Sequence, residues 1–90
     1  MKYEDLELNP YSRVLSVGMK EVELTEKEFL TMELLIKNAG RTMTRREIAE
    51  YAWQNAKDST NIVDVYINFL RKKIETITPR KYIHTVRGIG

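Results

Sequence analysis

One short pattern occurs twice in this chain, and each copy is typical of the start of a helix. The two copies are Thr25-Glu26-Lys27-Glu28 and Thr44-Arg45-Arg46-Glu47. In such a capping box the threonine hydroxyl accepts a hydrogen bond from the amide three residues on, and the glutamate carboxylate accepts one from the threonine amide. Apolar residues follow both boxes at helical spacing. The sequence therefore predicts two helices, the first ending near Gly40, which suits a left-handed C-terminal cap.

A third, longer helix is predicted after these two. Ser59 or Thr60 can cap it, and Thr78-Pro79 stops it after about Ile77, because a residue before proline is pushed out of the helical region. Four apolar side chains of this helix fall on one narrow stripe, which we expect to face the core. They are Val63, Ile67, Leu70 and Ile74.

The opposite face of the third helix has an unusual composition. It carries Asn61, Val65, Asn68, Phe69 and Lys72. Val65 and Phe69 either pack against a neighbouring element or belong to a DNA-reading surface. In the second interpretation, asparagine pairs with adenine and an apolar side chain meets the thymine methyl group in the major groove. We expect Val65 and Phe69 to be substantially exposed in the free domain.

Short strands are predicted on both sides of the helices. Tyr3–Leu8, Val14–Val17 and Val22–Leu24 are short runs separated by turn signals, which is typical of a small antiparallel meander. After the third helix, Tyr82–Arg87 alternates as a strand does and leads into Gly88-Ile89-Gly90. The second helix, a polar connection and the third helix make a helix-turn-helix variant. A strand that leads into a glycine turn directly after this variant predicts a wing, so the predicted fold class is α+β.

The charge of the chain is distributed unevenly along one small domain of residues 1–90. Residues 1–40 have a balance of −3 and residues 41–90 a balance of +5. A basic half is typical of a protein that meets a polyanion such as nucleic acid, but a solvated surface with chance asymmetry gives the same numbers. The charge alone leaves both interpretations open.

The residue sets that most catalytic and metal sites require are missing from the sequence. The chain has no cysteine and one histidine, His84, which we expect to be structural or surface-exposed. We expect Trp53 to belong to the core. The sequence has no phosphate-binding glycine loop and no calcium-loop spacing. We therefore predict no enzyme, no cofactor and no metal. Without a long apolar run or a signal-peptide pattern, we also expect a cytoplasmic protein with no membrane contact.

Several motifs in a fixed order carry a resemblance to a known family. They are Leu24-Thr25 with Glu28-Phe29, then Gly40, Arg45 and Trp53, then Val63-Asp64-Val65-Tyr66-Ile67 with Leu70-Arg71-Lys72-Lys73, and finally Thr85-Val86-Arg87-Gly88-Ile89-Gly90. With these motifs the chain resembles the C-terminal effector domain of the OmpR/PhoB response regulators. The resemblance implies a winged helix-turn-helix with a four-stranded N-terminal sheet, three helices and a C-terminal hairpin wing. It implies sequence-specific binding of double-stranded DNA in a two-component system.

The resemblance also implies which residues would meet DNA or other partners. The third helix would enter the major groove with Asn61, Val65, Asn68 and Phe69. Phosphates would be held by Arg45, Tyr66, Arg71, Lys72 and Lys73. The wing would reach the minor groove with Thr85 and Arg87. In activators of the family a loop here can touch RNA polymerase, and it matches Gln54, Asn55, Ala56, Lys57, Asp58, Ser59 and Thr60.

Several alternatives and departures qualify these expectations. Arg87 could instead pair with Asp64 and support the fold. Many members carry arginines where this chain has Asn68 and Phe69, often a glycine where it has Gln54, and usually a leucine at Thr31. The second wing strand and the phospho-accepting receiver domain, through which a sensor kinase would act, are absent from this chain. A winged-helix module for protein contacts, working through its acidic half or its loop, remains the alternative function.

The resemblance also implies how such a domain would assemble. Two copies are expected on a tandem direct repeat, with half-site centres about one helical turn apart. The isolated domain is expected to be monomeric in solution, because no long apolar seam offers a dimer interface.

Overall fold

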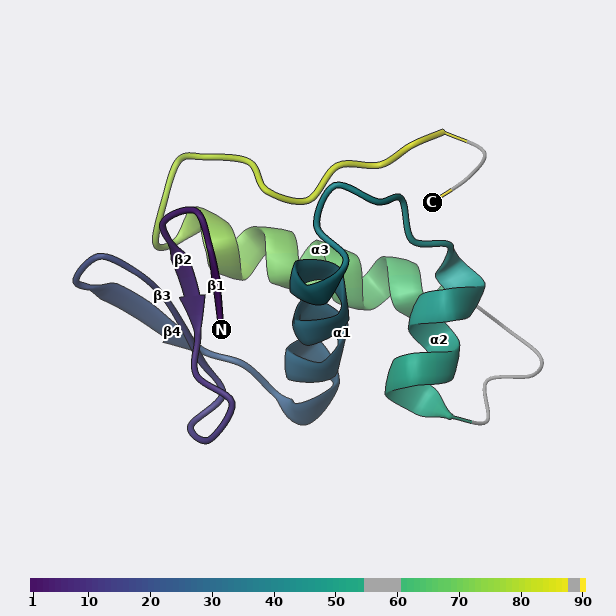
Figure 1. Ribbon diagram of the computed structural model, residues 1–90, viewed down its shortest axis with the longest axis horizontal. Coiled ribbons are helices and arrows are strands. Elements are labelled where there is room, and N and C mark those ends of the chain that lie inside the picture. The colour runs from purple at the N-terminus through teal and green to yellow at the C-terminus, as the bar shows by residue number, and fades with distance from the viewer. Residues whose placement is uncertain (55–60, 88–89) are drawn as a thin grey trace.

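A computed structural model describes residues 1–54, 61–87 and 90 as four strands followed by three helices. The sheet lies at one end of the molecule and α2 at the other, with α1 between them and α3 spanning the length (Figure 1). The elements are β1 (Lys2–Tyr3), β2 (Leu6–Leu8), β3 (Val14–Val17), β4 (Lys20–Glu23), α1 (Glu26–Lys37), α2 (Arg45–Trp53) and α3 (Asn61–Glu75). Within the described residues, no helix is both long enough and apolar enough to cross a membrane.

The four strands form one antiparallel sheet in the order β1-β2-β3-β4, as the family resemblance implies. Leu6 pairs with Val17 and Leu8 with Leu15, so alternate side chains of β2 point into the core. The prediction of one strand over Tyr3–Leu8 is wrong. The chain reverses between Tyr3 and Leu6, which pair with each other across a tight turn. Glu4 in that turn has a φ of 53°, and such a turn at a glutamate has no clear sequence signal, because glycine and asparagine are the usual residues at positive φ.

Both predicted capping boxes are present. At α1 the Thr25 hydroxyl accepts from the Glu28 amide at 3.4 Å, and the Glu28 carboxylate accepts from the Thr25 amide at 2.8 Å. At α2 both reciprocal bonds between Thr44 and Glu47 are 3.1 Å long. Gly40 follows α1 with a φ of 87°, which confirms its predicted left-handed conformation.

The core consists of two packed clusters that α3 joins. The larger cluster unites the sheet with α1 and the C-terminal half of α3, where Leu70 and Ile74 are buried. The smaller cluster lies between α1, α2 and the start of α3, where Val63 is buried and Ile67 is partly buried. The predicted core stripe of α3 is therefore confirmed. Thr31, the departure from the usual leucine, is fully buried, and its hydroxyl donates to the Lys27 carbonyl oxygen at 2.8 Å.

The segment after α3 runs back across the domain without forming a described strand, so the strand predicted over Tyr82–Arg87 is wrong. A strand needs a hydrogen-bonded neighbour, and side chains hold this segment instead. Arg80 contacts Glu4 at 2.8 Å and Asp5 at 3.3 Å, and the Tyr82 hydroxyl donates to Asp5. These contacts dock the segment on the turn between β1 and β2.

Candidate nucleic-acid interface

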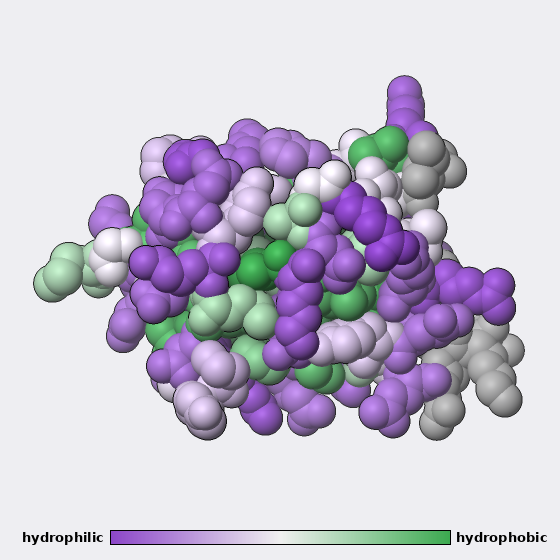
Figure 2. All heavy atoms as spheres, viewed as in Figure 1, coloured by the Kyte–Doolittle hydropathy of each residue, from purple (hydrophilic) through white to green (hydrophobic). Residues whose placement is uncertain are grey.

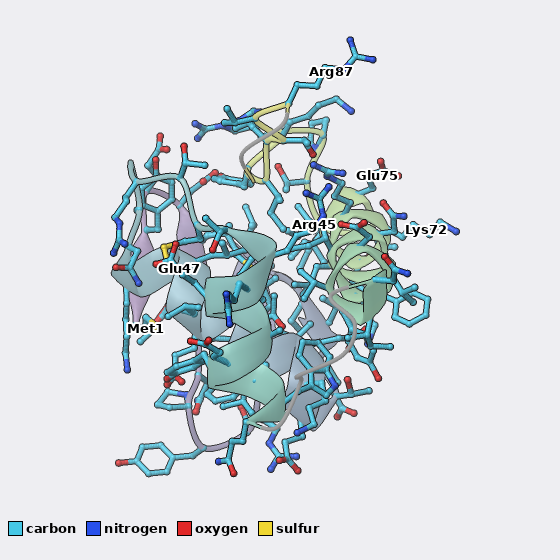
Figure 3. All side chains as sticks on the ribbon, turned by 90° about the vertical axis from the view of Figure 1, so that its right-hand side faces the viewer. Met1, Arg45, Glu47, Lys72, Glu75 and Arg87 are labelled. Carbon is cyan, nitrogen blue, oxygen red and sulfur yellow. The ribbon has the colours of Figure 1, made fainter. Side chains whose placement is uncertain are left out.

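The exposed face of α3 presents both amide and apolar side chains. Val65 is 43% exposed and Phe69 is 44% exposed, which confirms that they lie outside the core. Asn61, Asn68 and Lys72 are exposed on the same side of the helix. Figure 3 shows Lys72 directed away from the body of the protein. Four predicted major-groove residues and one predicted phosphate contact therefore share one surface.

An aromatic row connects this surface to α2. The ring of Trp53 meets that of Tyr66 edge to face at 5.0 Å, and Tyr66 meets Phe69 in the same manner at 5.3 Å. Trp53 is half-buried and packs against the smaller core cluster, with Lys27 Nζ 5.9 Å from its ring centre. The core prediction for Trp53 is thus only partly right, because its side chain at the end of α2 is only partly buried.

Arg45 lies at the start of α2 and is bound to the first turn of α3. Its Nε donates to Asp64 Oδ1 at 2.8 Å, and both side chains are about half exposed. Figure 3 shows Arg45 between α2 and α3. Asp64 was the alternative partner of Arg87, but in the described residues it pairs with Arg45. The sequence carried no local signal for this contact, because the two residues are far apart in the chain.

Arg71 and Lys73 make contacts within the domain. Arg71 donates to the Thr85 hydroxyl at 2.7 Å and to the Ile83 carbonyl oxygen at 3.4 Å, so it ties the C-terminal segment to α3. Lys73 donates to the buried Glu28 carboxylate at 2.5 Å and to the Glu23 carbonyl oxygen at 3.0 Å. These contacts give the Lys73 ammonium group a structural role, and they do not test the phosphate role predicted for it.

The predicted wing residues lie at one end of the molecule. Arg87 is exposed and extends beyond the rest of the chain in Figure 3. Val86 and Gly90 exchange two backbone hydrogen bonds of 2.5 and 2.9 Å, which bring the chain back on itself just after Arg87. Thr85 and His84 are exposed, as expected for a surface segment.

A cleft of about 500 Å³ separates the C-terminal segment from α1 and α3. Met32, Leu35, Ile36 and Ile67 contribute apolar side chains to it. Figure 2 shows apolar residues reaching the surface in the middle of this face, with hydrophilic residues around them. Since a helix turns about 100° per residue, Ile67 and Phe69 point to different sides of α3. The cleft and the exposed face of α3 are therefore separate surfaces.

The loop after α2 was predicted to contact RNA polymerase. Only Gln54 belongs to the described residues, and Asn55–Thr60, with the predicted caps of α3, lie outside them. Gln54 has a φ of 53° and a ψ of −47°. Because this backbone region favours glycine, the structure explains why a glycine suits the position in related sequences.

Two carboxylates near the site stay ionised to lower pH than usual. A backbone hydrogen bond from Thr44 and the nearby Arg41 guanidinium lower the pKa of Glu47. Burial raises the pKa of Glu28, but hydrogen bonds from Lys73 and Thr25 outweigh it, so that the net pKa is lowered. Both carboxylates therefore stay ionised, and each has a cationic partner inside the domain.

The family model for transcriptional regulatory protein, C terminal (Trans_reg_C), matches residues 19–90. The chain belongs to this family. Trans_reg_C domains are regulatory domains and not enzymes, in agreement with the expectation from the sequence.

Individual relatives show the same relationship. The response regulator MprA of Mycobacterium tuberculosis (strain ATCC 25618 / H37Rv) is 40% identical over 91 residues, which cover 100% of this chain and 40% of MprA. The chain thus spans about 40% of the length of the curated relatives it matches.

Solved structures confirm the winged-helix fold. The C-terminal domain of the nisin resistance regulator NsrR has a TM-score of 0.84 at 31% identity and covers 99% of this chain and 91% of that chain. The Klebsiella pneumoniae RstA DNA-binding domain in complex with the RstA box has a TM-score of 0.80 at 29% identity and covers 100% of this chain and 91% of that chain.

Proposed function

We propose that this Trans_reg_C domain binds double-stranded DNA sequence-specifically, as the effector part of a longer response regulator. The observation that carries this proposal is the match, over the whole chain, to an RstA domain solved on its own DNA box. In the present chain, α3 offers the exposed surface that a recognition helix needs, with amide, apolar and cationic side chains on one side.

In this proposal α3 enters the major groove. Asn61, Val65, Asn68 and Phe69 face the base edges, and Lys72 reaches a phosphate from the same surface. Arg45, Tyr66 and Arg71 lie at the borders of this surface and contribute phosphate contacts. Lys73 is also proposed to reach a phosphate, in addition to the hydrogen bond that it donates to Glu28 inside the domain.

The wing supplies a second contact. Arg87 and Thr85 lie where the chain doubles back, and a guanidinium is suited to the strong negative potential of a narrow minor groove. Arg71 joins Thr85 to α3, so that it fixes the wing relative to the recognition helix.

The larger assembly is part of the same proposal. Two copies occupy a direct repeat, with half-site centres about 10 to 11 bp apart, and the domain is monomeric without DNA. A receiver domain outside this chain responds to a sensor kinase, residues 54–60 contact RNA polymerase, and the protein works in the cytoplasm.

Selection of bound sequences from a random duplex library tests the proposal. We expect one motif to be enriched, and its affinity to fall steeply as salt rises, because phosphate contacts release counterions. Lys72→Ala should reduce the salt dependence by about one phosphate contact, whereas Lys20→Ala, on the exposed strand β4, should leave it unchanged. No enriched motif, or binding that ignores salt, would refute DNA recognition.

A further inference from the structure

We propose that the apolar part of the α3 surface reads thymine 5-methyl groups, with Phe69 as the specificity-determining residue and Tyr66 as the residue that positions it. This inference rests on the proposed function and adds the chemistry of the bases that are recognised. The inference rests on the residues that surround and support Phe69, and not on the exposure of its side chain alone.

The apolar part of the surface is a continuous strip along α3. Ile62, Val65 and Phe69 follow one another at spacings of three and four residues, and each is between 37% and 44% exposed. With a rotation of about 100° per residue, Asn68, Asn61 and Lys72 fall directly beside this strip. The whole exposed sector from Asn68 to Ile62 contains no carboxylate.

The acidic residues of α3, Asp64 and Glu75, lie outside this sector, and the exposed Glu75 adjoins it about 20° from Asn68. Asp64 is turned toward α2, where Arg45 neutralises it. A polyanion that approaches the strip therefore meets amide groups and one lysine but no negative charge in the sector. A strip with these neighbours is suited to DNA and less suited to a basic protein partner.

The Phe69 ring has a fixed support. Its partner Tyr66 is half-buried and meets it at an interplanar angle of 66°, and Tyr66 in turn stands at 77° on Trp53. Trp53 packs against the smaller core cluster. An exposed phenylalanine would otherwise lose side-chain freedom on binding, so this support lowers the entropy lost when it contacts a base.

The major groove offers one apolar group to such a residue. Among the base edges only thymine presents a methyl group there, beside the adenine edge that an asparagine reads in the neighbouring position. Phe69 and Val65 next to Asn68 thus match an A·T-containing half-site. Family members with arginines at these positions would instead be suited to guanine.

Replacement of single thymines by deoxyuridine tests this inference, because the change removes only the methyl group. The probe is the duplex selected in the library experiment, with one thymine replaced at a time. For the wild-type domain, at least one replacement should weaken binding about fourfold, the effect of burying one methyl group. Phe69→Ala should bind the thymine and uracil duplexes equally, and Phe69→Leu should keep part of the difference.

Two further variants separate recognition from general effects. Tyr66→Ala should reduce the thymine preference while Phe69 is still present, since the ring loses its support. Tyr11→Ala, at an exposed aromatic residue on the β2–β3 loop, should keep the full preference. Thermal melts of each variant verify that it is folded.

The outcomes distinguish this inference from the proposed function. If the wild type binds its selected duplex but treats thymine and uracil alike at every position, Phe69 does not read methyl groups, although DNA recognition stands. If Phe69→Ala retains the full thymine preference, another residue is responsible and the inference is overturned. If no duplex is selected at all, the proposed function itself fails.

Discussion

Lys73 Nζ, in the last turn of α3, lies 2.5 Å from Oε1 of Glu28, the carboxylate that closes the capping box of α1. The same oxygen accepts the Thr25 amide, and the same ammonium donates to the Glu23 carbonyl oxygen. One buried anion and one half-buried cation thus join β4, α1 and α3. A substitution that removes the charge of either partner leaves the other without its counter-charge in a partly buried place.

Acidification should weaken the domain through Glu28. Its pKa is lowered in the folded protein, so its contribution to stability is present above the unfolded pKa and is lost as pH falls through the folded value. We expect the urea midpoint of the wild type to fall as pH drops below about 4.5. Glu28→Gln should be less stable at pH 7 and should show a smaller fall. Glu26→Gln, at an exposed position in the same turn, should behave as the wild type; equal pH profiles for all three would contradict this role.

Truncation of Leu70 should strongly destabilise the domain, whereas truncation of Asn68 should not. Leu70 is fully buried in the larger core cluster and Asn68 is exposed. Leu70→Ala should cost about 2 to 5 kcal/mol of unfolding free energy, which is a large share of the stability of a small domain. Urea melts of Leu70→Ala and Asn68→Ala measure the difference, and equal midpoints would show that the two faces of α3 are wrongly assigned.

Gln54→Gly should stabilise the domain. Gln54 has a φ of 53° at the end of α2, where a side chain is strained. Relief of that strain should add about 0.5 to 1 kcal/mol, after the greater freedom of glycine in the unfolded chain is subtracted. Gln54→Ala keeps a Cβ atom and should gain little. Chemical denaturation of both variants tests this, and a loss of stability in Gln54→Gly would show that the side chain contributes more than the backbone strain.

Arg87 should contribute affinity and a preference for A·T-rich flanks. It is exposed where the chain doubles back, and a narrow A·T minor groove attracts an arginine. Arg87→Ala should weaken binding and flatten the flank preference without a change in melting temperature. Arg87→Lys should recover only part, because an ammonium group is more strongly hydrated. Binding curves on A·T and G·C flanks measure this; a lower melting temperature with an unchanged preference would indicate a structural role.

The helices could be predicted from the sequence because their signals are local. Each capping box lies within four residues, and the stripe from Val63 to Ile74 follows from helical periodicity alone. The same periodicity placed Val65 and Phe69 on the exposed side of α3. Features that depend only on the periodicity of one helix can therefore be predicted from the sequence of that helix.

The contacts between elements could not be predicted in this way. Arg45 with Asp64 and Lys73 with Glu28 join residues far apart in the chain, and long cationic side chains look alike in sequence whether they face solvent or a buried carboxylate. The strand predicted from Tyr82 failed for a related reason. Alternation shows that a segment could be a strand, but a sheet neighbour decides whether it is one.

The Arg45–Asp64 ion pair reduces the positive charge that Arg45 can offer to nucleic acid. Because Nε of Arg45 donates to Asp64 Oδ1 at 2.8 Å, an arriving phosphate meets a guanidinium whose charge is already partly balanced, and it either competes with Asp64 or binds the other N–H donors of Arg45. We therefore expect Asp64 to compete with DNA phosphates for Arg45. In that case Arg45 should add little to the binding of random duplex, and more to the binding of a duplex whose bases also contact the exposed face of α3. A carboxylate beside the recognition surface would in this way lower the affinity for non-specific DNA, and so raise the ratio of specific to non-specific affinity.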